Sequence, residues 1–159
     1  MRFKNCFRFF PLAAVIAVSI LSAQMAPQLK VEPQATIKVK RGAPATVTLK
    51  VALPEGYHAN SNKPTDPNLI PLVLKWSGGP LGDSVITYPK PLMEQYTFTA
   101  GKPISVVTGA FDLVTKFNVP ATAPTGPATE TGTVRYQACN DRMCFPPKTV
   151  NVNVTVSVE

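Results

Sequence analysis

The segment Lys148-Thr-Val-Asn-Val-Asn-Val-Thr-Val-Ser-Val158 carries the clearest structural pattern in this chain of 159 residues. Five valines alternate with polar residues from Val150 to Val158. An alternation with period two places the valines on one face of a β-strand and the polar residues on the other. The segment therefore predicts a strand that buries one face in a core and exposes the other to solvent.

The same alternation, or a short apolar run between turn residues, recurs along the chain and predicts further strands. Most of the 17 prolines lie between these runs, where they mark strand ends and turns because proline cannot donate to a ladder. Many short strands with such spacing predict an all-β, antiparallel sandwich. The last two strands are expected to pair as a hairpin, with residues 120–128 as a surface connection. The predicted strands before the last one are 35–40, 46–53, 70–76, 85–88, 104–108, 110–119 and 133–138.

Residues 1–23 are predicted to be a secretory signal peptide. Three basic residues precede the apolar run Leu12–Leu21, which is too short for a confident membrane span. An uncleaved anchor is the alternative interpretation. Cys6 lies in this segment, so the exported protein retains two cysteines, and a disulfide forms and persists in that compartment. Residues 24–34 are predicted to be an N-terminal leader, and residues 35–159 a single domain.

The charge pattern excludes several classes of function. Loss of the three basic residues of the signal lowers the formal charge of +7, and the remaining lysines are scattered singly. This pattern does not indicate binding to nucleic acid or to an anionic membrane.

The sequence also lacks the usual catalytic motifs. No nucleophile motif and no paired carboxylates occur, and the single histidine, His58, is expected to be structural or exposed. The sequence predicts no cofactor and no small-molecule substrate.

The segment Tyr136-Gln-Ala-Cys139-Asn-Asp-Arg-Met-Cys144-Phe-Pro-Pro147 holds both retained cysteines. Only four residues separate them, so they can form one disulfide at the neck of the predicted hairpin. A bridge that closes so small a loop adds only about 2 kcal/mol to stability in the loop-closure treatment. The pair is therefore either a modest structural disulfide or a redox site. Nearby positive charge from Arg142 and Lys148 would favour the reactive thiolate, which Asp141 partly opposes.

Strand parity gives an expectation for the first of these cysteines. Val134, Tyr136 and Ala138 would share one face of the strand. Cys139 then falls on the opposite face, which predicts an accessible sulfur rather than one in the core.

This cysteine segment, followed by the valine-rich strand, resembles the N-terminal periplasmic domain of DsbD, the bacterial transmembrane thiol:disulfide interchange protein. Weaker similarities lie in Pro54–His58, in Ile86–Pro89 and in Tyr96–Phe98. The resemblance implies an immunoglobulin-like sandwich located in the periplasm. It also implies that the cysteine pair passes electrons between thiol proteins.

The resemblance further implies roles for single residues. Cys144 would form the mixed disulfide with a partner protein, and Cys139 would resolve it. Tyr96 or Phe98 would be an aromatic cap over the cysteines, with Tyr96 preferred. The expected partners are thioredoxin-like or disulfide-isomerase proteins and a separate membrane electron donor, since the chain stops at Glu159. The four residues between the cysteines are one fewer than in the best-known members of the family.

The alternative function is a non-enzymatic binding module in which the hairpin disulfide is structural. Cys139, Met143 and Cys144 are soft ligands that would suit monovalent copper, with help from Met93 or His58. Zinc fits less well, because a closed zinc site needs four ligands. A module that only binds a protein partner is the remaining possibility of this kind.

Overall fold

The computed structural model describes residues 27–159, so the predicted signal peptide lies outside the described residues. These residues form strands joined by turns and a single short 3-10 helix. The elements are β1 (Lys30–Val31), β2 (Ile37–Val39), β3 (Pro44–Ala52), β4 (His58–Asn60), β5 (Val73–Gly78), β6 (Asp83–Thr87), β7 (Leu92–Glu94), η1 (Thr97–Thr99), β8 (Ile104–Thr108), β9 (Ala110–Asn118), β10 (Gly126–Tyr136), β11 (Ala138–Cys139) and β12 (Lys148–Val158).

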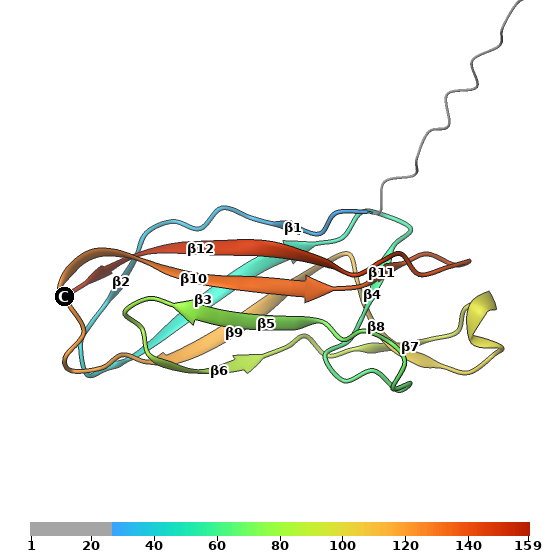
Figure 1. The fold of residues 1–159 in the computed structure, drawn as a ribbon, viewed down its shortest axis with the longest axis horizontal. Helices are drawn as coiled ribbons and strands as arrows, with labels where there is room; N and C mark the ends of the chain where they lie inside the picture. Colours follow the sequence, from blue (N-terminus) through green and yellow to red (C-terminus); the bar gives the residue numbers. More distant parts are fainter. Residues whose placement is uncertain (1–26) are drawn as a thin grey trace, which may run out of the picture.

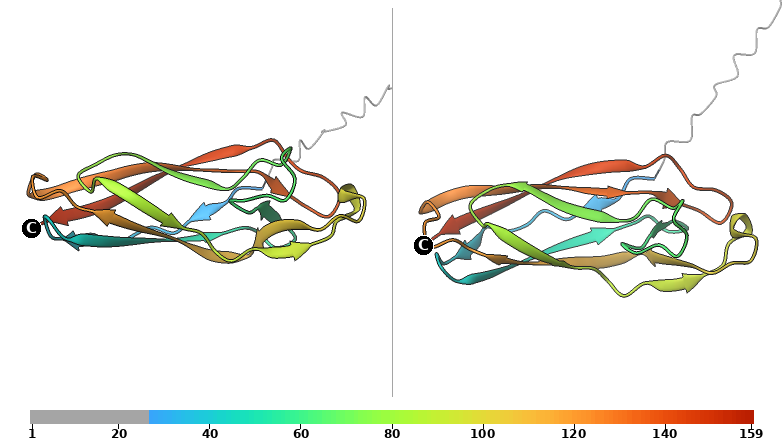
Figure 2. Two further views of the ribbon diagram at one scale, coloured as in Figure 1. Left: turned by 90° about the horizontal axis from the view of Figure 1, so that it is seen from below. Right: turned by 60° about the horizontal axis from the view of Figure 1, so that its bottom comes forward.

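Two four-stranded sheets form the body of the sandwich, and Figures 1 and 2 show them as two layers. One sheet has the order β1-β3-β9-β6 and the other the order β2-β12-β10-β5. A third sheet, of order β11-β4-β8-β7, continues the sandwich at one end. The all-β antiparallel prediction is confirmed, with one exception: β2 runs parallel to β12.

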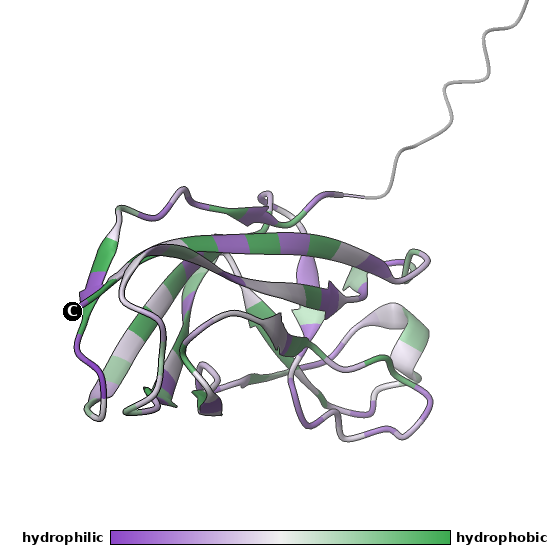
Figure 3. Ribbon diagram, turned by 60° about the vertical axis from the view of Figure 1, so that its left-hand side comes forward, coloured by the Kyte–Doolittle hydropathy of each residue, from purple (hydrophilic) through white to green (hydrophobic). Residues whose placement is uncertain are grey.

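The core lies between the two main sheets and is built from the predicted alternation. On β12, Val152, Val154, Val156 and Val158 are all buried. Figure 3 shows this alternation as bands of hydrophobic and hydrophilic colour along the long strands. Apolar residues of the facing sheet complete the core, among them Val47, Leu49, Val51, Leu113 and Phe117. The largest fully buried side chain is that of Tyr136, on β10.

The β10–β12 hairpin is longer than the sequence predicted. It pairs in unbroken register from Gly126 opposite Val158 to Tyr136 opposite Lys148. The predicted strand 133–138 therefore began too late and the predicted connection 120–128 ended too late. The reason is that residues 126–131 carry few apolar side chains, so that no hydrophobic alternation marks them as strand. The long neighbour β12 orders this stretch through backbone hydrogen bonds.

Two strands of the third sheet, β11 and β8, directly continue strands of the main sheets. β10 ends at Tyr136, and after Gln137 the chain pairs with β4 as β11. In the same way β8 and β9 are separated only by Gly109, whose φ of +61° favours glycine. The backbone N–H of Leu53 donates to the Gly109 carbonyl at 2.9 Å. This hydrogen bond links the end of β3 to the junction between β8 and β9. The cysteines of β11 and its hairpin thus lie at the end of the molecule opposite the C-terminus (Figure 1).

Residues 27–34, expected as part of a leader outside the sandwich, contact it. β1 pairs with β3, and Leu29 is only 1% exposed. The backbone N–H of Leu29 donates to Tyr136 Oη at 2.9 Å, and that hydroxyl donates to the Pro27 carbonyl at 3.3 Å. A single buried phenol therefore holds the start of the described chain against the core.

Tyr136→Phe should lower the free energy of unfolding by about 1–3 kcal/mol, because it leaves the buried Leu29 N–H without an acceptor. Urea unfolding measures the loss, and amide hydrogen exchange should show faster exchange around Leu29. Unchanged exchange at that amide would contradict the role given to the hydroxyl.

Candidate functional site

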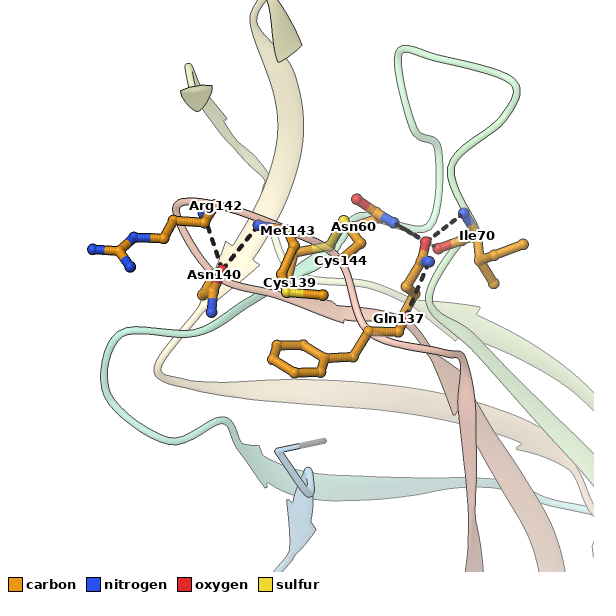
Figure 4. The surroundings of a disulfide bond; sticks show 9 residues. Asn60, Ile70, Gln137, Cys139, Asn140, Arg142, Met143 and Cys144 are labelled. Carbon is orange, nitrogen blue, oxygen red and sulfur yellow. Dashed lines mark hydrogen bonds between the residues drawn. A yellow bond between two sulfur atoms is a disulfide. The ribbon is translucent and has the colours of Figure 1, made fainter. Parts of the chain in front are cut away.

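Cys139 and Cys144 form a disulfide across a short hairpin (Figure 4). The side chain of Asn140 shapes its turn, since Oδ1 accepts from the backbone N–H of Arg142 at 3.0 Å and of Met143 at 2.9 Å. The backbone closes the hairpin on both sides of the bridge: Asn140 N–H donates to the Met143 carbonyl, and Phe145 N–H donates to the Ala138 carbonyl, each at 2.9 Å. We call residues 139–144 the cysteine hairpin.

The two sulfurs are unequal in exposure. Cys139 is fully buried, whereas Cys144 is half-buried. As parity predicted, Val134, Tyr136 and Ala138 belong to the main core, and Cys139 lies on the other face. The prediction of an accessible Cys139 sulfur is nevertheless wrong. The chain leaves the β5–β10–β12 ladder at Gln137 and pairs with β4, where Cys139 lies opposite a second buried residue, His58.

Gln137 anchors the cysteine hairpin to the neighbouring elements (Figure 4). Its Oε1 accepts from Asn60 Nδ2 at 3.2 Å and from the backbone N–H of Ile70 at 3.3 Å. Its Nε2 donates to the Phe145 carbonyl at 3.2 Å. Sequence reasoning missed this role, because a glutamine between two strands carries no distinctive signal.

Aromatic rings from residues 94–101, which we call the cap loop, lie against this site. Tyr96 stacks on His58 with ring centroids 4.0 Å apart and planes 12° from parallel. Phe98 continues the stack 5.6 Å from Tyr96. Thr97 Oγ1 donates to the Asp141 carbonyl at 2.6 Å, which ties the loop directly to the cysteine hairpin. Both aromatic residues expected in a cap thus reach the strand beside Cys139, and Tyr96 makes the closer contact with it.

The cap loop is held mainly by its own contacts. Thr99 Oγ1 donates to the Tyr96 carbonyl at 2.9 Å and accepts from the Tyr96 N–H at 3.3 Å, around the single turn of η1. The turn ends at Ala100, which has the left-handed values φ 50° and ψ 38°, and Gly101 follows at φ 78°. A left-handed non-glycine residue is uncommon and marks local strain in a backbone segment.

The side chains proposed as additional copper ligands differ in their exposure to solvent. Met143 in the cysteine hairpin and Met93 on β7 are both more than half exposed, whereas His58 is buried. In residues 27–159, no group of three or more His, Cys, Asp and Glu side chains is gathered in a way that could hold a metal ion. The described residues also contain no helix that is long and apolar enough to cross a membrane.

The family described as "Thiol:disulfide interchange protein DsbD, N-terminal" matches residues 26–156. The chain belongs to this family. The resemblance seen in the cysteine segment is therefore confirmed over nearly the whole described chain. The DsbD N-terminal family acts in thiol–disulfide exchange, and the close cysteine pair is present here.

One solved structure agrees with the fold of this DsbD N-terminal family member, and a second is similar to a lesser degree. The N-terminal periplasmic domain of ScsB from Proteus mirabilis matches with a TM-score of 0.57 at 12% identity. The match covers 84% of this chain but only 48% of the ScsB chain, so this chain spans about half the length of that structure. The N-terminal domain of Neisseria meningitidis DsbD in the reduced form matches with a TM-score of 0.41 at 17% identity, over 74% of this chain and 82% of the other. The fold is an all-β sandwich built almost entirely of antiparallel strands. No curated protein matches the chain.

Burial dominates the electrostatics of this DsbD-like site. It lowers the pKa of His58 from 6.5 to about 4, and the nearby Asp141 carboxylate opposes this change only in part. Burial also raises the pKa of the Tyr96 phenol, and the negative charges of Glu94 and Asp141 raise it further. At neutral pH the stack therefore consists of an uncharged imidazole against an uncharged phenol. His58, which the sequence predicted to be structural or exposed, is buried and lies opposite Cys139.

The free energy of unfolding should decrease as the pH falls from about 6.5 to about 4, because the unfolded chain protonates His58 more readily than the folded protein does. The folded protein binds this proton only near pH 4, whereas the unfolded chain binds it near pH 6.5. The contribution of neutral, buried His58 to the free energy of unfolding is therefore complete above pH 6.5. It is lost progressively toward pH 4, and the total loss is at most about 3 kcal/mol. Urea unfolding between pH 7.5 and 4.5 measures the loss. His58→Phe should show a smaller loss over this range, and equal pH dependence of the two proteins would contradict the prediction.

Proposed function

We propose that Cys139 and Cys144 are a redox-active pair that exchanges electrons with thiol proteins in the periplasm. The observation that carries the proposal is the position of the disulfide: it lies at one end of the sandwich, on the face turned away from the main core, beside a small cap loop. A purely structural bridge gains most when it joins distant segments, whereas this one closes a loop between residues five apart in sequence. Membership of the DsbD N-terminal family supports the same conclusion.

The difference in exposure between the two sulfurs supports distinct roles. In the reduced protein the half-buried Cys144 is the sulfur that a partner can reach. Its thiolate attacks one sulfur of the partner disulfide, forms a mixed disulfide and displaces the partner's other sulfur as a thiolate. The Cys139 thiolate then attacks the Cys144 sulfur, which restores the internal disulfide and releases the partner as a dithiol. Two electrons pass to the partner, and two protons from the cysteine pair end on the partner or in solvent.

The cap loop supports a shielding role for Tyr96 and Phe98. Tyr96 rests on His58, and Thr97 holds the loop to the cysteine hairpin through one hydrogen bond. Breaking that bond and the stacking contact would free the loop without disturbing the core, to which neither ring belongs. Movement of the loop would then uncover the cysteines for a partner protein.

The family relation supports thioredoxin-like or disulfide-isomerase proteins as partners. A membrane electron donor would supply the electrons, and residues 1–23 would direct export to the periplasm. The direction of electron flow between such proteins follows the difference in their reduction potentials, where 30 mV corresponds to about 1.4 kcal/mol. The reduction potential of the purified protein separates this proposal from the structural alternative, since structural disulfides have potentials below about −300 mV.

Cys139→Ala should accumulate a mixed disulfide with the partner in the native host, because no thiol remains to resolve it. Non-reducing gel electrophoresis and mass spectrometry after rapid alkylation detect and identify the adduct. Cys144→Ala is the matched control and should trap little or nothing, since the remaining sulfur is buried. Equal trapping by the two variants would contradict the assigned roles, and absence of any adduct would count against exchange with proteins.

Tyr96→Ala should speed reduction of the disulfide by a small dithiol several-fold, because it removes the ring that covers the strand beside Cys139. Stopped-flow measurement with dithiothreitol gives the rate, and Tyr96→Phe is the control because it retains the ring. Phe98→Ala tests the outer ring separately and should have a smaller effect. A rate for Tyr96→Ala equal to that of the unmodified protein would remove Tyr96 as a shield.

A further inference from the structure

Two buried polar side-chain atoms in residues 27–159 lack a hydrogen-bond partner, and both are on β4. They are His58 Nε2 and Asn60 Oδ1. Residues two apart in a strand share a face, so both atoms belong to the same side of β4. That side faces the cysteine segment: Asn60 donates to Gln137, and His58 lies opposite Cys139 in the ladder. Buried polar atoms are normally satisfied, and each exception calls for an explanation.

The surroundings of His58 leave its Nε2 without a donor. Tyr96 covers one face of the ring through stacking rather than through a hydrogen bond. Asp141, the charged residue that acts on His58, is itself an acceptor. Nε2 is also out of contact with solvent, so bulk water does not satisfy it.

His58 has two opposite residues across the strands, Cys139 on β11 and Thr108 on β8. Thr108 makes no hydrogen bond to Nε2, so Cys139 is the other opposite residue to consider. Directly opposite residues of an antiparallel pair have Cβ atoms about 4.5–5.5 Å apart on the same face, so their side chains are neighbours. In the disulfide, the Cys139 sulfur carries no hydrogen and cannot donate. In the reduced protein it carries an S–H group, which is a donor.

We propose that His58 is a positioning residue whose Nε2 accepts a hydrogen bond from the Cys139 thiol in the reduced protein, and that this bond shifts the redox equilibrium of the pair toward the dithiol. This inference rests on the proposed redox function of the pair. Reduction adds two electrons and two protons, breaks the sulfur–sulfur bond and leaves one proton on each sulfur. The proton on Cys139 is then shared with Nε2. Because the disulfide offers no such donor, the hydrogen bond exists on one side of the equilibrium only.

The state of the imidazole fits this role. Burial lowers the pKa of His58 to about 4, so the ring is neutral at pH 7 and one ring nitrogen is free to accept. A neutral acceptor with so low a pKa leaves the proton on Cys139 in the resting dithiol, and Cys139 loses this proton only when it resolves the mixed disulfide. The more exposed Cys144 is then the sulfur that ionises and attacks, in agreement with the roles assigned above.

The test separates the acceptor from the stacking contact by means of two variants. His58→Phe retains a ring for Tyr96 to stack on and removes the acceptor, whereas His58→Gln loses the ring but retains an amide oxygen that can accept. The equilibrium constant of the cysteine pair against dithiothreitol is measured for both variants and for the unmodified protein at pH 7, by alkylation and mass spectrometry. Circular dichroism confirms that each variant is folded.

His58→Phe should make the disulfide about tenfold harder to reduce, the effect of losing one net hydrogen bond. A tenfold change in this two-electron equilibrium corresponds to about 30 mV. His58→Gln should lie closer to the unmodified protein than His58→Phe does. The inference is overturned if His58→Phe leaves the equilibrium unchanged while the unmodified pair is readily reduced, or if His58→Gln shifts the equilibrium more than His58→Phe. A pair that dithiothreitol does not reduce in the unmodified protein would instead overturn the proposed function, and this inference with it.

Discussion

The long ladder between β10 and β12 is the constraint on which the rest of this structure depends. Its register runs without interruption from Gly126 opposite Val158 to Tyr136 opposite Lys148. A shift of one residue would turn every buried valine of β12 toward solvent, so the hydrophobic pattern fixes the register. The same register fixes where the two strands separate, and it therefore brings the two segments that carry the cysteines to one end of the sandwich.

The site forms where this ladder can no longer continue. At Gln137 the chain leaves β12 and β5 and pairs with β4, and the side chain of Gln137 satisfies the backbone groups at this junction through Ile70 and Phe145. This change of partner gives the cysteine hairpin a second buried face, separate from the main core. The result is a pair of sulfurs with unequal access, since Cys139 is buried and Cys144 is half-buried.

Several polar side chains near the cysteine hairpin are buried, although most buried side chains of the protein are apolar. The strands of the two large sheets supply a mainly apolar core, in which the buried Thr115 and Glu130 each accept a hydrogen bond, from Trp76 Nε1 and from the Leu81 N–H. The third sheet buries His58, Asn60 and Ser105 beside apolar residues, at a free-energy cost that a simple scaffold would not need. Four of the six buried polar residues of the described chain lie on or beside β4 and β8, near the cap loop and the cysteine hairpin, whereas Thr115 and Glu130 lie in the two large sheets. Departures of this kind are expected at functional sites rather than in the scaffold.

The sequence by itself determined the sandwich, because the alternation in segments such as 148–158 and 46–53 follows directly from the geometry of a strand with one buried face. It also determined the cysteine pairing, since two retained cysteines separated by four residues can close one hairpin. It did not reveal the short strands β4 and β7, which are too short to show any period, or the start of β10, where few apolar residues mark the strand. The burial of Cys139 and the contact between His58 and Tyr96 were decided only by the tertiary structure. Both depend on which strand lies beside β11, and such long-range pairing depends on how the whole chain packs rather than on local sequence pattern.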